Sequence, residues 1–342
     1  MRAARLHEYG HPLTIDDVAM PEPGPGEVLV KVEGAGVCHS DLHVFDGRLK
    51  LVPELPWILG HENAGRIEAL GVGVSGLERG EPVAVFGGWG CGRCRFCLGG
   101  EEHQCDLMRW VGHGYPGGYA EYLLVPSARH LVPIFDLDPI DAAPLTDAAL
   151  TPYRAVKRSL RYIAPNGAVL LIGLGGLGYF GLQVLRFMSP TRVAVVETSP
   201  KKRDLALELG AQASFDPSDP DLDRQVAAFA RGDGYDAVFD FVGVNSTLAL
   251  AVGSVGRNGR VVLVGLGGGS FPLTFKSMPL EAGVVTSSWG NRNELVEVID
   301  LARRGLLVAR VERYPLTRIN EAVERLRSGA VDGRAVVLPN DG

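Results

Sequence analysis

The second half of the chain is organised around the stretch Val169-Leu-Leu-Ile-Gly173-Leu-Gly175-Gly176-Leu-Gly178. The apolar run predicts a buried strand, the glycines a tight turn, and the following residues a helix. Glycines in such a turn let a pyrophosphate approach the backbone, and they let the helix pack closely on the strand. Glu197, nineteen positions after Gly178, ends the next predicted strand, where a carboxylate can accept hydrogen bonds from ribose hydroxyls. The pattern predicts a site for a dinucleotide, with Glu197 favouring NAD over NADP; its residues are Gly173, Gly175, Gly176, Leu177, Gly178 and Glu197.

Outward from this stretch, short apolar segments alternate with helical patterns. The strands expected are Ala168–Ile172, Arg192–Val196, Asp236–Phe241, Arg260–Val264 and Val284–Ser287, and the helices include Gly178–Met188 and Pro200–Leu209. Such alternation predicts an α/β fold, a doubly wound parallel sheet of the Rossmann type with helices on both faces. The uncharged run 167–185 has the length of a membrane span, but its glycines favour a strand, a turn and a buried helix. No membrane association is expected.

The first 150 residues have a different texture. Short extended segments such as Val28–Val32 are separated by many Gly and Pro residues, which indicates β-rich structure with frequent turns. Near the C-terminus, 294–304 and 320–328 have a helical period, and 333–338 is expected to form a closing strand.

Four cysteines follow the spacing Cys91-x2-Cys94-x2-Cys97-x7-Cys105. Four thiolates in one Gly-rich loop can close a tetrahedron around a zinc ion and leave no position for substrate, which is typical of a structural site. An iron–sulfur cluster is the alternative, but the common bacterial run has three residues before its last Cys and a Pro after it, and this chain has seven residues and Asp106. Zinc is therefore the favoured ion.

The fifth cysteine, Cys38, lies apart, and His61-Glu62 follows some twenty positions later. A catalytic zinc needs three protein ligands and one open position, and Cys38 and His61 are plausible as two of them. Asp147 lies where the β-rich part meets the α/β part, a place where a cleft between domains is expected. Taken singly, Cys38 can equally be an inert buried thiol, His61 a core histidine and Asp147 a helix N-cap.

The length of the chain, its net charge and the motifs that it lacks exclude several classes of protein. The chain has 342 residues, enough for two domains, and its net charge of −6 comes from scattered residues, so no nucleic-acid partner is expected. No secretory signal is recognised at the N-terminus, and an odd number of cysteines favours reduced thiols or metal ligands in the cytoplasm. Neither a Walker A motif, nor a second His after His61-Glu62, nor Gly-x-Ser-x-Gly occurs, which argues against P-loop NTPases, zincins and α/β-hydrolases.

Taken together, these residues resemble the zinc-dependent alcohol dehydrogenases of the medium-chain dehydrogenase/reductase superfamily. The likeness runs from Pro23-Gly-Pro-Gly-Glu27 to Gly333-Arg-Ala-Val-Val337, and it looks closest to the tetrameric bacterial and archaeal secondary alcohol dehydrogenases. It implies a GroES-like catalytic domain formed by residues 1–149 and 289–342, with a structural zinc lobe at about 88–107, and a Rossmann domain at 150–288. One departure stands out, because Asp147 occupies the position where many relatives have a second Cys.

The resemblance also implies roles for individual residues. Cys38, His61 and Asp147 would hold a catalytic zinc, with Glu62 as a transient ligand and Asp41 orienting His61. Ser40 would take the proton of the alcohol and pass it through the nicotinamide ribose to His43 and on to solvent. The remaining residues implied to contact the cofactor are His39 and Arg334 at the pyrophosphate, and Phe241, Val264 and Leu266 around the nicotinamide.

For the substrate, Trp89, Trp110 and Trp289 match aromatic positions that line the cleft in relatives, although core packing explains them equally well. An apolar cleft suits small aliphatic, cyclic or aryl alcohols and ketones. The expected enzyme interconverts mostly secondary alcohols with ketones, using NAD and two zinc ions per chain, as a homotetramer. The alternatives are a polyol or amino-alcohol dehydrogenase of the same superfamily, or a non-catalytic NAD-binding protein. The other histidines are assigned no chemistry and are expected at the surface or in packing: His7, His11, His103, His113 and His130.

Overall fold

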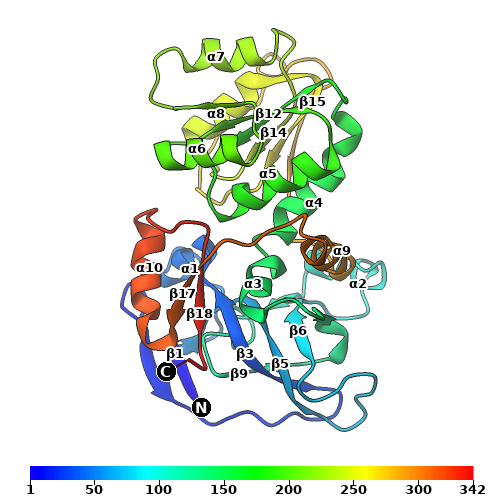
Figure 1. Cartoon of the computed structure of the whole chain (residues 1–342), viewed down its shortest axis with the longest axis vertical. Helices are drawn as coiled ribbons and strands as arrows, with labels where there is room; N and C mark the ends of the chain where they lie inside the picture. Colours follow the sequence, from blue (N-terminus) through cyan, green and yellow to red (C-terminus); the bar gives the residue numbers. More distant parts are fainter. Residues whose placement is uncertain (342) are drawn as a thin grey trace. The chain divides into compact units, whose positions relative to one another are not determined.

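The computed structural model describes residues 1–341, which form two compact units. Unit 1 joins Met1–Leu150 to the segment that begins at Gly290, and unit 2 is Thr151–Trp289. Figure 1 shows unit 2 in green to yellow, and unit 1 in the colours of the two ends of the chain.

Unit 2 contains one sheet whose six strands all run parallel, in the order β13-β12-β11-β14-β15-β16. The strands β11, β12 and β13 follow one another from the centre of the sheet to one edge. The chain then crosses back, and β14, β15 and β16 follow one another from the centre to the opposite edge. Because crossovers between parallel strands are right-handed, α5 and α6 cover one face and α8 covers the other. The strands are β11 (Ala168–Ile172), β12 (Arg192–Val196), β13 (Ala213–Phe215), β14 (Tyr235–Asp240), β15 (Val255–Leu263) and β16 (Gly283–Thr286), and the helices are α4 (Leu150–Ser159), α5 (Gly176–Met188), α6 (Pro200–Glu208), α7 (Leu222–Phe229) and α8 (Asn245–Ser254).

The predicted Rossmann-type sheet is thus confirmed, with strand ends within one residue of expectation except at the start of β15, five residues earlier. The short edge strand β13 and the helices α7 and α8 were not individually predicted. The uncharged run 167–185 forms β11 and most of α5. Within residues 1–341, every helix is too short or too polar to cross a membrane.

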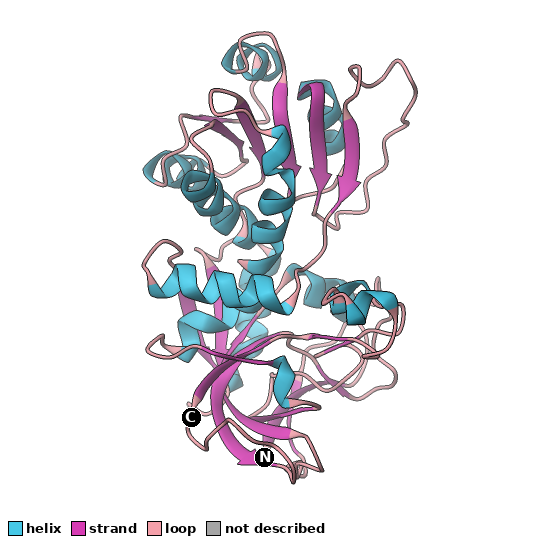
Figure 2. Ribbon diagram, turned by 90° about the vertical axis from the view of Figure 1, so that its right-hand side faces the viewer, coloured by secondary structure: helices cyan, strands magenta, loops and turns pink. Residues whose placement is uncertain are grey.

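Unit 1 is built on a seven-stranded sheet with the order β10-β6-β5-β3-β18-β17, in which β9 also pairs with β3. Figure 2 shows its long strands as strongly bent ribbons. Two smaller sheets complete it, β2-β1-β4 and β7-β8. The strands are β1 (Arg2–Leu6), β2 (Thr14–Asp17), β3 (Val28–Gly36), β4 (Trp57–Ile58), β5 (Glu62–Leu70), β6 (Pro82–Val85), β7 (Gly88–Trp89), β8 (Arg109–Trp110), β9 (Tyr122–Val125), β10 (Leu131–Pro133), β17 (Val311–Pro315) and β18 (Arg334–Leu338), and the helices are α1 (His39–Phe45), α2 (Arg95–Leu98), α3 (Pro139–Ala142), α9 (Arg292–Arg303) and α10 (Ile319–Arg327).

The ladder between β3 and β5 sets the position of the chemistry-bearing residues. Its register pairs Gly36 with Glu62, so Cys38, just beyond β3, and His61, just before β5, lie at the same end of the ladder. Gly36 is required there because a Cβ would collide with the Glu62 carboxylate. The 3-10 helix η3 (Ala143–Thr146) packs against β5 and delivers Asp147 to the same end.

Candidate active site

The Gly-rich turn of unit 2 has the geometry of a phosphate-binding loop. Gly173 adopts a φ of +89°, which favours glycine, and a Cβ on Gly178 would collide with the carbonyl of Gly173. Gly175 is the N-cap of α5, and a Cβ placed there would meet no atom within 4 Å. The backbone at the N-terminus of a thirteen-residue helix is thus open to an anion, as a dinucleotide pyrophosphate requires.

Glu197 lies directly after β12 and is largely buried. One carboxylate oxygen accepts the N–H of Leu174 at 2.7 Å, and the other accepts the N–H of Ser199 at 2.9 Å. The nearby cation Arg203 is already bound, because it pairs with Asp216 at 2.9 Å and donates to the carbonyl of Glu197 at 2.8 Å. Arg203 is thus engaged by Asp216 and the backbone, and the Glu197 carboxylate opposes a 2′-phosphate.

A cavity of about 1180 Å³ opens in unit 2, lined among others by Gly173, Glu197, Val242 and Thr247. Asp240 fixes the loop on its far side, since one oxygen accepts the N–H groups of Val242 and Gly243 at 2.9 Å each. The other residues predicted to contact the nicotinamide lie at the ends of β14 and β15: Phe241, Val264 and Leu266. Leu266 is 61% exposed and Val264 is buried.

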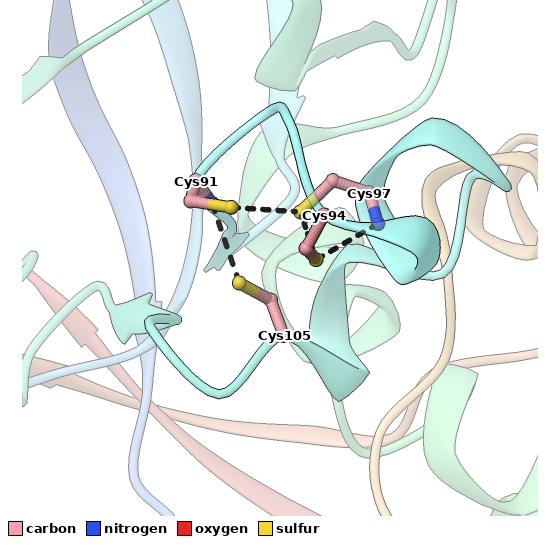
Figure 3. Close-up of side chains that lie close together, drawn as sticks. All are labelled: Cys91, Cys94, Cys97 and Cys105. Carbon is pink, nitrogen blue, oxygen red and sulfur yellow. Dashed lines mark hydrogen bonds between the residues drawn. The ribbon is translucent and has the colours of Figure 1, made fainter.

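The side chains of Cys91, Cys94, Cys97 and Cys105 lie close together in unit 1 and form a four-thiol cluster (Figure 3). The sulfurs of Cys94 and Cys97 are 3.5 Å apart and those of Cys91 and Cys97 are 3.9 Å apart. A tetrahedral zinc with Zn–S bonds of about 2.3 Å places its sulfurs about 3.8 Å apart. All four cysteines are free thiols, and these two separations are close to that value.

The electrostatics of this cluster point the same way. Backbone N–H groups of Arg93 and Cys94 lower the pKa of Cys91 to about 6, whereas burial raises the pKa of Cys97 to about 12. A coordinated cation would favour the thiolate form of Cys97, which burial opposes.

The mixed cluster comprises Cys38, His61, Glu62 and Asp147, whose ligand atoms all lie within 4.8 Å of one another. Asp147 Oδ2 is 3.7 Å from Cys38 Sγ and 3.3 Å from His61 Nε2. These are the separations expected around one tetrahedral zinc, at about 3.3–3.8 Å. Asp147 is the C-cap of η3.

A buried hydrogen-bond network fixes the orientation of His61. Asp41 is fully buried and its Oδ1 lies 3.2 Å from His61 Nδ1, as predicted, which leaves Nε2 facing Asp147. Its Oδ2 accepts the N–H of Cys38 at 2.9 Å and the hydroxyl of Tyr119 at 2.8 Å. Burial alone would raise the pKa of Asp41, but the charge and hydrogen bond of His61 outweigh it and lower the pKa. Tyr119 was missed in the sequence, because nothing local marks a tyrosine eighty positions away as a partner of Asp41.

Glu62 and Arg334 form a fully buried ion pair. Arg334 Nε donates to one carboxylate oxygen of Glu62 at 2.9 Å, and its second guanidinium nitrogen pairs with the other oxygen. Burial raises the pKa of Glu62 to about 7 against the opposing effect of Arg334. The structure thus places a predicted pyrophosphate contact, Arg334, against a predicted transient ligand, Glu62.

The residues of the predicted proton path share helix α1. Ser40 Oγ is 3.4 Å from His61 Nε2, and His43 follows one turn later on the same face of the helix. Burial and the charge of Arg48 lower the pKa of His43 against the opposing effect of Asp46, so its imidazole is neutral at neutral pH and available as a base. His39 is exposed at the start of α1.

The three tryptophans predicted to line the substrate pocket do not lie together in the structure. The Trp110 ring lies 5.4 Å from that of His113, tilted by 36°, and the His113 ring is 5.4 Å from that of His61, so Trp110 lies near the mixed cluster. Trp89 packs instead on Tyr115 at 5.0 Å and lines a cavity with Cys91. Trp289 is buried at the end of unit 2. His113, expected at the surface or in packing, is buried beside the cluster.

Comparison with known proteins agrees with this geometry. Residues 24–136 match the family model of the alcohol dehydrogenase GroES-like domain, and 176–304 match that of the zinc-binding dehydrogenases. The NAD-dependent alcohol dehydrogenase of Sulfurisphaera tokodaii is 36% identical, over 99% of this chain and 100% of that protein. The D-arabinose 1-dehydrogenase (NADP(+)) of Saccharolobus solfataricus is 35% identical, over 99% and 97% of the two chains.

The crystal structure of the alcohol dehydrogenase from Aeropyrum pernix superposes with a TM-score of 0.93 at 38% identity, covering 99% of this chain and 100% of that one. The chain therefore belongs to the zinc-dependent alcohol dehydrogenases of the medium-chain dehydrogenase/reductase superfamily. The resemblance and the fold predicted from the sequence, a GroES-like domain with a Rossmann-type domain, are both confirmed.

Proposed function

We propose that this chain is an NAD-dependent alcohol dehydrogenase that interconverts secondary alcohols with ketones, and primary or aryl alcohols with aldehydes or ketones. The convergence of Cys38, His61 and Asp147, which are far apart in the sequence but within ligand distance in the fold, carries the proposal. A protein that only binds NAD has no use for three ligands oriented by a buried Asp41. Intact Ser40 and His43 argue against the non-catalytic alternative in the same way.

Zinc fits both clusters, so two zinc ions per chain are expected, a catalytic one at the mixed cluster and a structural one at the four-thiol cluster. A zinc ion at the mixed cluster supplies a Lewis acid that eases deprotonation of an alcohol, and NAD supplies the hydride acceptor. Cys38, His61 and Asp147 hold that ion, and Arg334 keeps Glu62 oriented beside them.

Side chains of the protein carry the proton that the alcohol loses. Ser40, close to His61 Nε2, would receive the proton of the substrate hydroxyl and pass it through the nicotinamide ribose to His43, one helical turn further on, which would release it to solvent. Glu197 and the turn at 173–178 hold the adenosine and pyrophosphate parts of NAD, with Arg334 and His39 at the pyrophosphate and Phe241, Val264 and Leu266 around the nicotinamide. Trp110, which lies near the mixed cluster, supplies an apolar wall for the substrate.

A polyol or sugar dehydrogenase is the second candidate, since a full-length relative is named D-arabinose 1-dehydrogenase. A homotetramer and a cytoplasmic location remain part of the proposal. So does a catalytic domain formed by residues 1–149 and 289–342 around a Rossmann domain at 150–288.

Reduced-nicotinamide absorbance tests the proposal directly. The zinc content of the purified protein is measured first. The rate of nicotinamide reduction is then measured with NAD, and separately with NADP, for 2-butanol, cyclohexanol, 1-phenylethanol, ethanol and sorbitol. Turnover that favours NAD and the apolar secondary alcohols supports the proposal. A protein that holds two zinc ions and binds NAD but turns over none of the alcohols would overturn it.

A further inference from the structure

The start of helix α9 is tied to the loop 91–105, which carries the four-thiol cluster, and the mechanism above does not use this connection. Asn291 is the N-cap of α9. Its Oδ1 accepts the N–H of Glu294 at 2.8 Å, and its Nδ2 donates to Oε1 of Glu101, a residue of the loop, at 3.1 Å. Figure 1 shows α9 next to α2, which lies in the same loop. The amide of Asn291 therefore joins two segments that are 190 positions apart in the sequence.

Glu101 is itself held from within the loop. Its Oε2 accepts the amide N–H of Gln104 at 2.9 Å, and Nε2 of His103 lies 3.5 Å from the same oxygen. An Asp at position 291 would cap α9 as well as Asn does, because either side chain accepts a backbone N–H of the first helical turn. Only the amide can also donate to a carboxylate, so Asn291 is the residue that suits both the helix and Glu101.

The segment that begins at Gly290 packs against the residues on both sides of Asp147. On one side, α9 lies against η3, whose C-cap is Asp147. On the other side, a Cβ on Gly290 would lie 2.5 Å from Leu150 Cδ1, so the backbone of Gly290 touches Leu150, three positions after Asp147. Local hydrogen bonding holds Asp147 loosely, because its N–H is 3.4 Å from the carbonyl of Pro144. Packing against β5 and against this segment therefore sets the position of Asp147.

We propose that Glu101 is a positioning residue for the mixed cluster: through Asn291 and α9 it fixes η3, and so holds Asp147 where a zinc ligand has to lie. The proposal rests on the proposed function, because it requires a zinc ion at the mixed cluster. Groups that orient a metal ligand typically change metal affinity by about 10–100-fold, and a group that acts through a helix should contribute at the lower end. The loop 91–105 thus has a second role besides its own stability, which is the retention of zinc at the mixed cluster.

The test exchanges the amide and the carboxylate between the two positions. Asn291→Asp keeps the helix cap but places two carboxylates against each other. Asn291→Asp combined with Glu101→Gln restores an amide opposite a carboxylate, with the donor now on the loop. The zinc-loaded proteins are treated with a chelator, and the rate constants of zinc loss are measured. The Cys38→Ser protein, which should hold zinc at the four-thiol cluster alone, identifies the phase that belongs to that cluster.

We expect Asn291→Asp to accelerate the loss of zinc from the mixed cluster by about fivefold to tenfold, because a hydrogen bond to a charged group is replaced by a repulsion. The double variant should return to within about twofold of the wild-type rate constant. Glu101→Gln alone should have little effect, since its amide oxygen still accepts from Asn291. A purely structural role of the bond would lower the Tm of Asn291→Asp without changing this rate constant.

The matched control is Asn340→Asp, the same substitution in another side chain that ties distant parts of unit 1 together. Asn340 Nδ2 donates to the carbonyls of Val32 at 2.7 Å and Glu121 at 3.0 Å. This variant should lower the Tm and leave the loss of zinc from the mixed cluster unchanged. If Asn291→Asp does not fold, Glu101→Ala removes the acceptor from a partly exposed side chain and should accelerate zinc loss by about threefold.

Two results would overturn the inference and leave the proposed function standing. One is a wild-type rate of zinc loss from the mixed cluster in Asn291→Asp, and the other is an accelerated loss that Glu101→Gln does not reverse. A wild-type protein that holds no zinc at the mixed cluster would instead refute the proposed function and this inference with it.

Discussion

The two clusters of unit 1 that could hold a metal ion are built in opposite ways. The four-thiol cluster takes all its ligands from fifteen consecutive residues, with like atoms and partial exposure. The mixed cluster takes its ligands from positions up to 109 residues apart, with three kinds of donor atom and a buried partner behind His61. A closed shell of thiolates holds a loop together, whereas an assembled, mixed shell leaves a position for substrate. This contrast supports the proposal that the four-thiol cluster stabilises the fold and that the mixed cluster carries the chemistry.

The largest effect is expected from Cys38→Ser, which tests the catalytic role proposed for the mixed cluster. Loss of the thiolate should remove the catalytic zinc and lower kcat/KM by at least about 10³, because the Lewis acid contributes several kcal/mol to transition-state stabilisation. Zinc analysis should find one ion per chain instead of two, with NAD binding measured by fluorescence unchanged. A Cys38→Ser enzyme with full activity would refute the assignment of the mixed cluster.

The reciprocal experiment is Cys97→Ser in the four-thiol cluster. It should also remove one zinc, but the loss should appear as about 3 kcal/mol of unfolding free energy, or a Tm lower by roughly 6–12 °C. The kcat per folded molecule should stay close to that of the wild type when it is measured well below the Tm. A collapse of kcat with an unchanged Tm would mean that the two clusters have exchanged roles.

The same contrast explains what the sequence could reveal. The spacing of the cysteines at 91–105 and the turn at 173–178 are local, and the sequence alone predicted a metal cluster and a parallel α/β sheet with a dinucleotide loop. The pairing of Gly36 with Glu62, which brings Cys38 to His61, is long-range, so the residues alone left Cys38, His61 and Asp147 as weak candidates. The family resemblance was what predicted that these three residues form one site. Nothing in either source pointed to Tyr119, because its role depends on which side chains surround Asp41 in the fold.

Asp41→Asn tests the mixed cluster alone, because Asp41 is the buried carboxylate that pairs with His61. An amide cannot hold the Nδ1–H of His61 as a carboxylate does, so catalytic zinc affinity or kcat/KM should fall by about 10–100-fold. Structural zinc should be retained, which metal analysis after mild chelation can verify. The matched control is Asp236→Asn in unit 2, where the carboxylate accepts the N–H of Ala164 at 2.8 Å and activity should not change. Equal effects in the two variants would contradict a positioning role for Asp41.

The smallest expected effect comes from Tyr119→Phe, which removes one hydroxyl at the outer edge of this network. The hydroxyl donates to the charged Asp41 at 2.8 Å and contacts the carbonyl of Gly36 at 3.2 Å, so its loss should cost about 1.5 kcal/mol of unfolding free energy. Asp41 keeps the N–H of Cys38 and the ring of His61, so kcat/KM should fall by only about threefold to tenfold.

The control for this variant is Tyr235→Phe in unit 2, where the hydroxyl donates to the neutral carbonyl of Val226 at 3.0 Å. Both phenols are fully buried, so the two variants differ in whether the lost bond ends on a carboxylate that orients a metal ligand. Tyr235→Phe should lose about 1 kcal/mol of stability, measured by urea unfolding, and no activity. If kcat/KM fell equally in both variants, the hydroxyl of Tyr119 would act on the fold alone, and the network that separates the mixed cluster from the four-thiol cluster would end at Asp41.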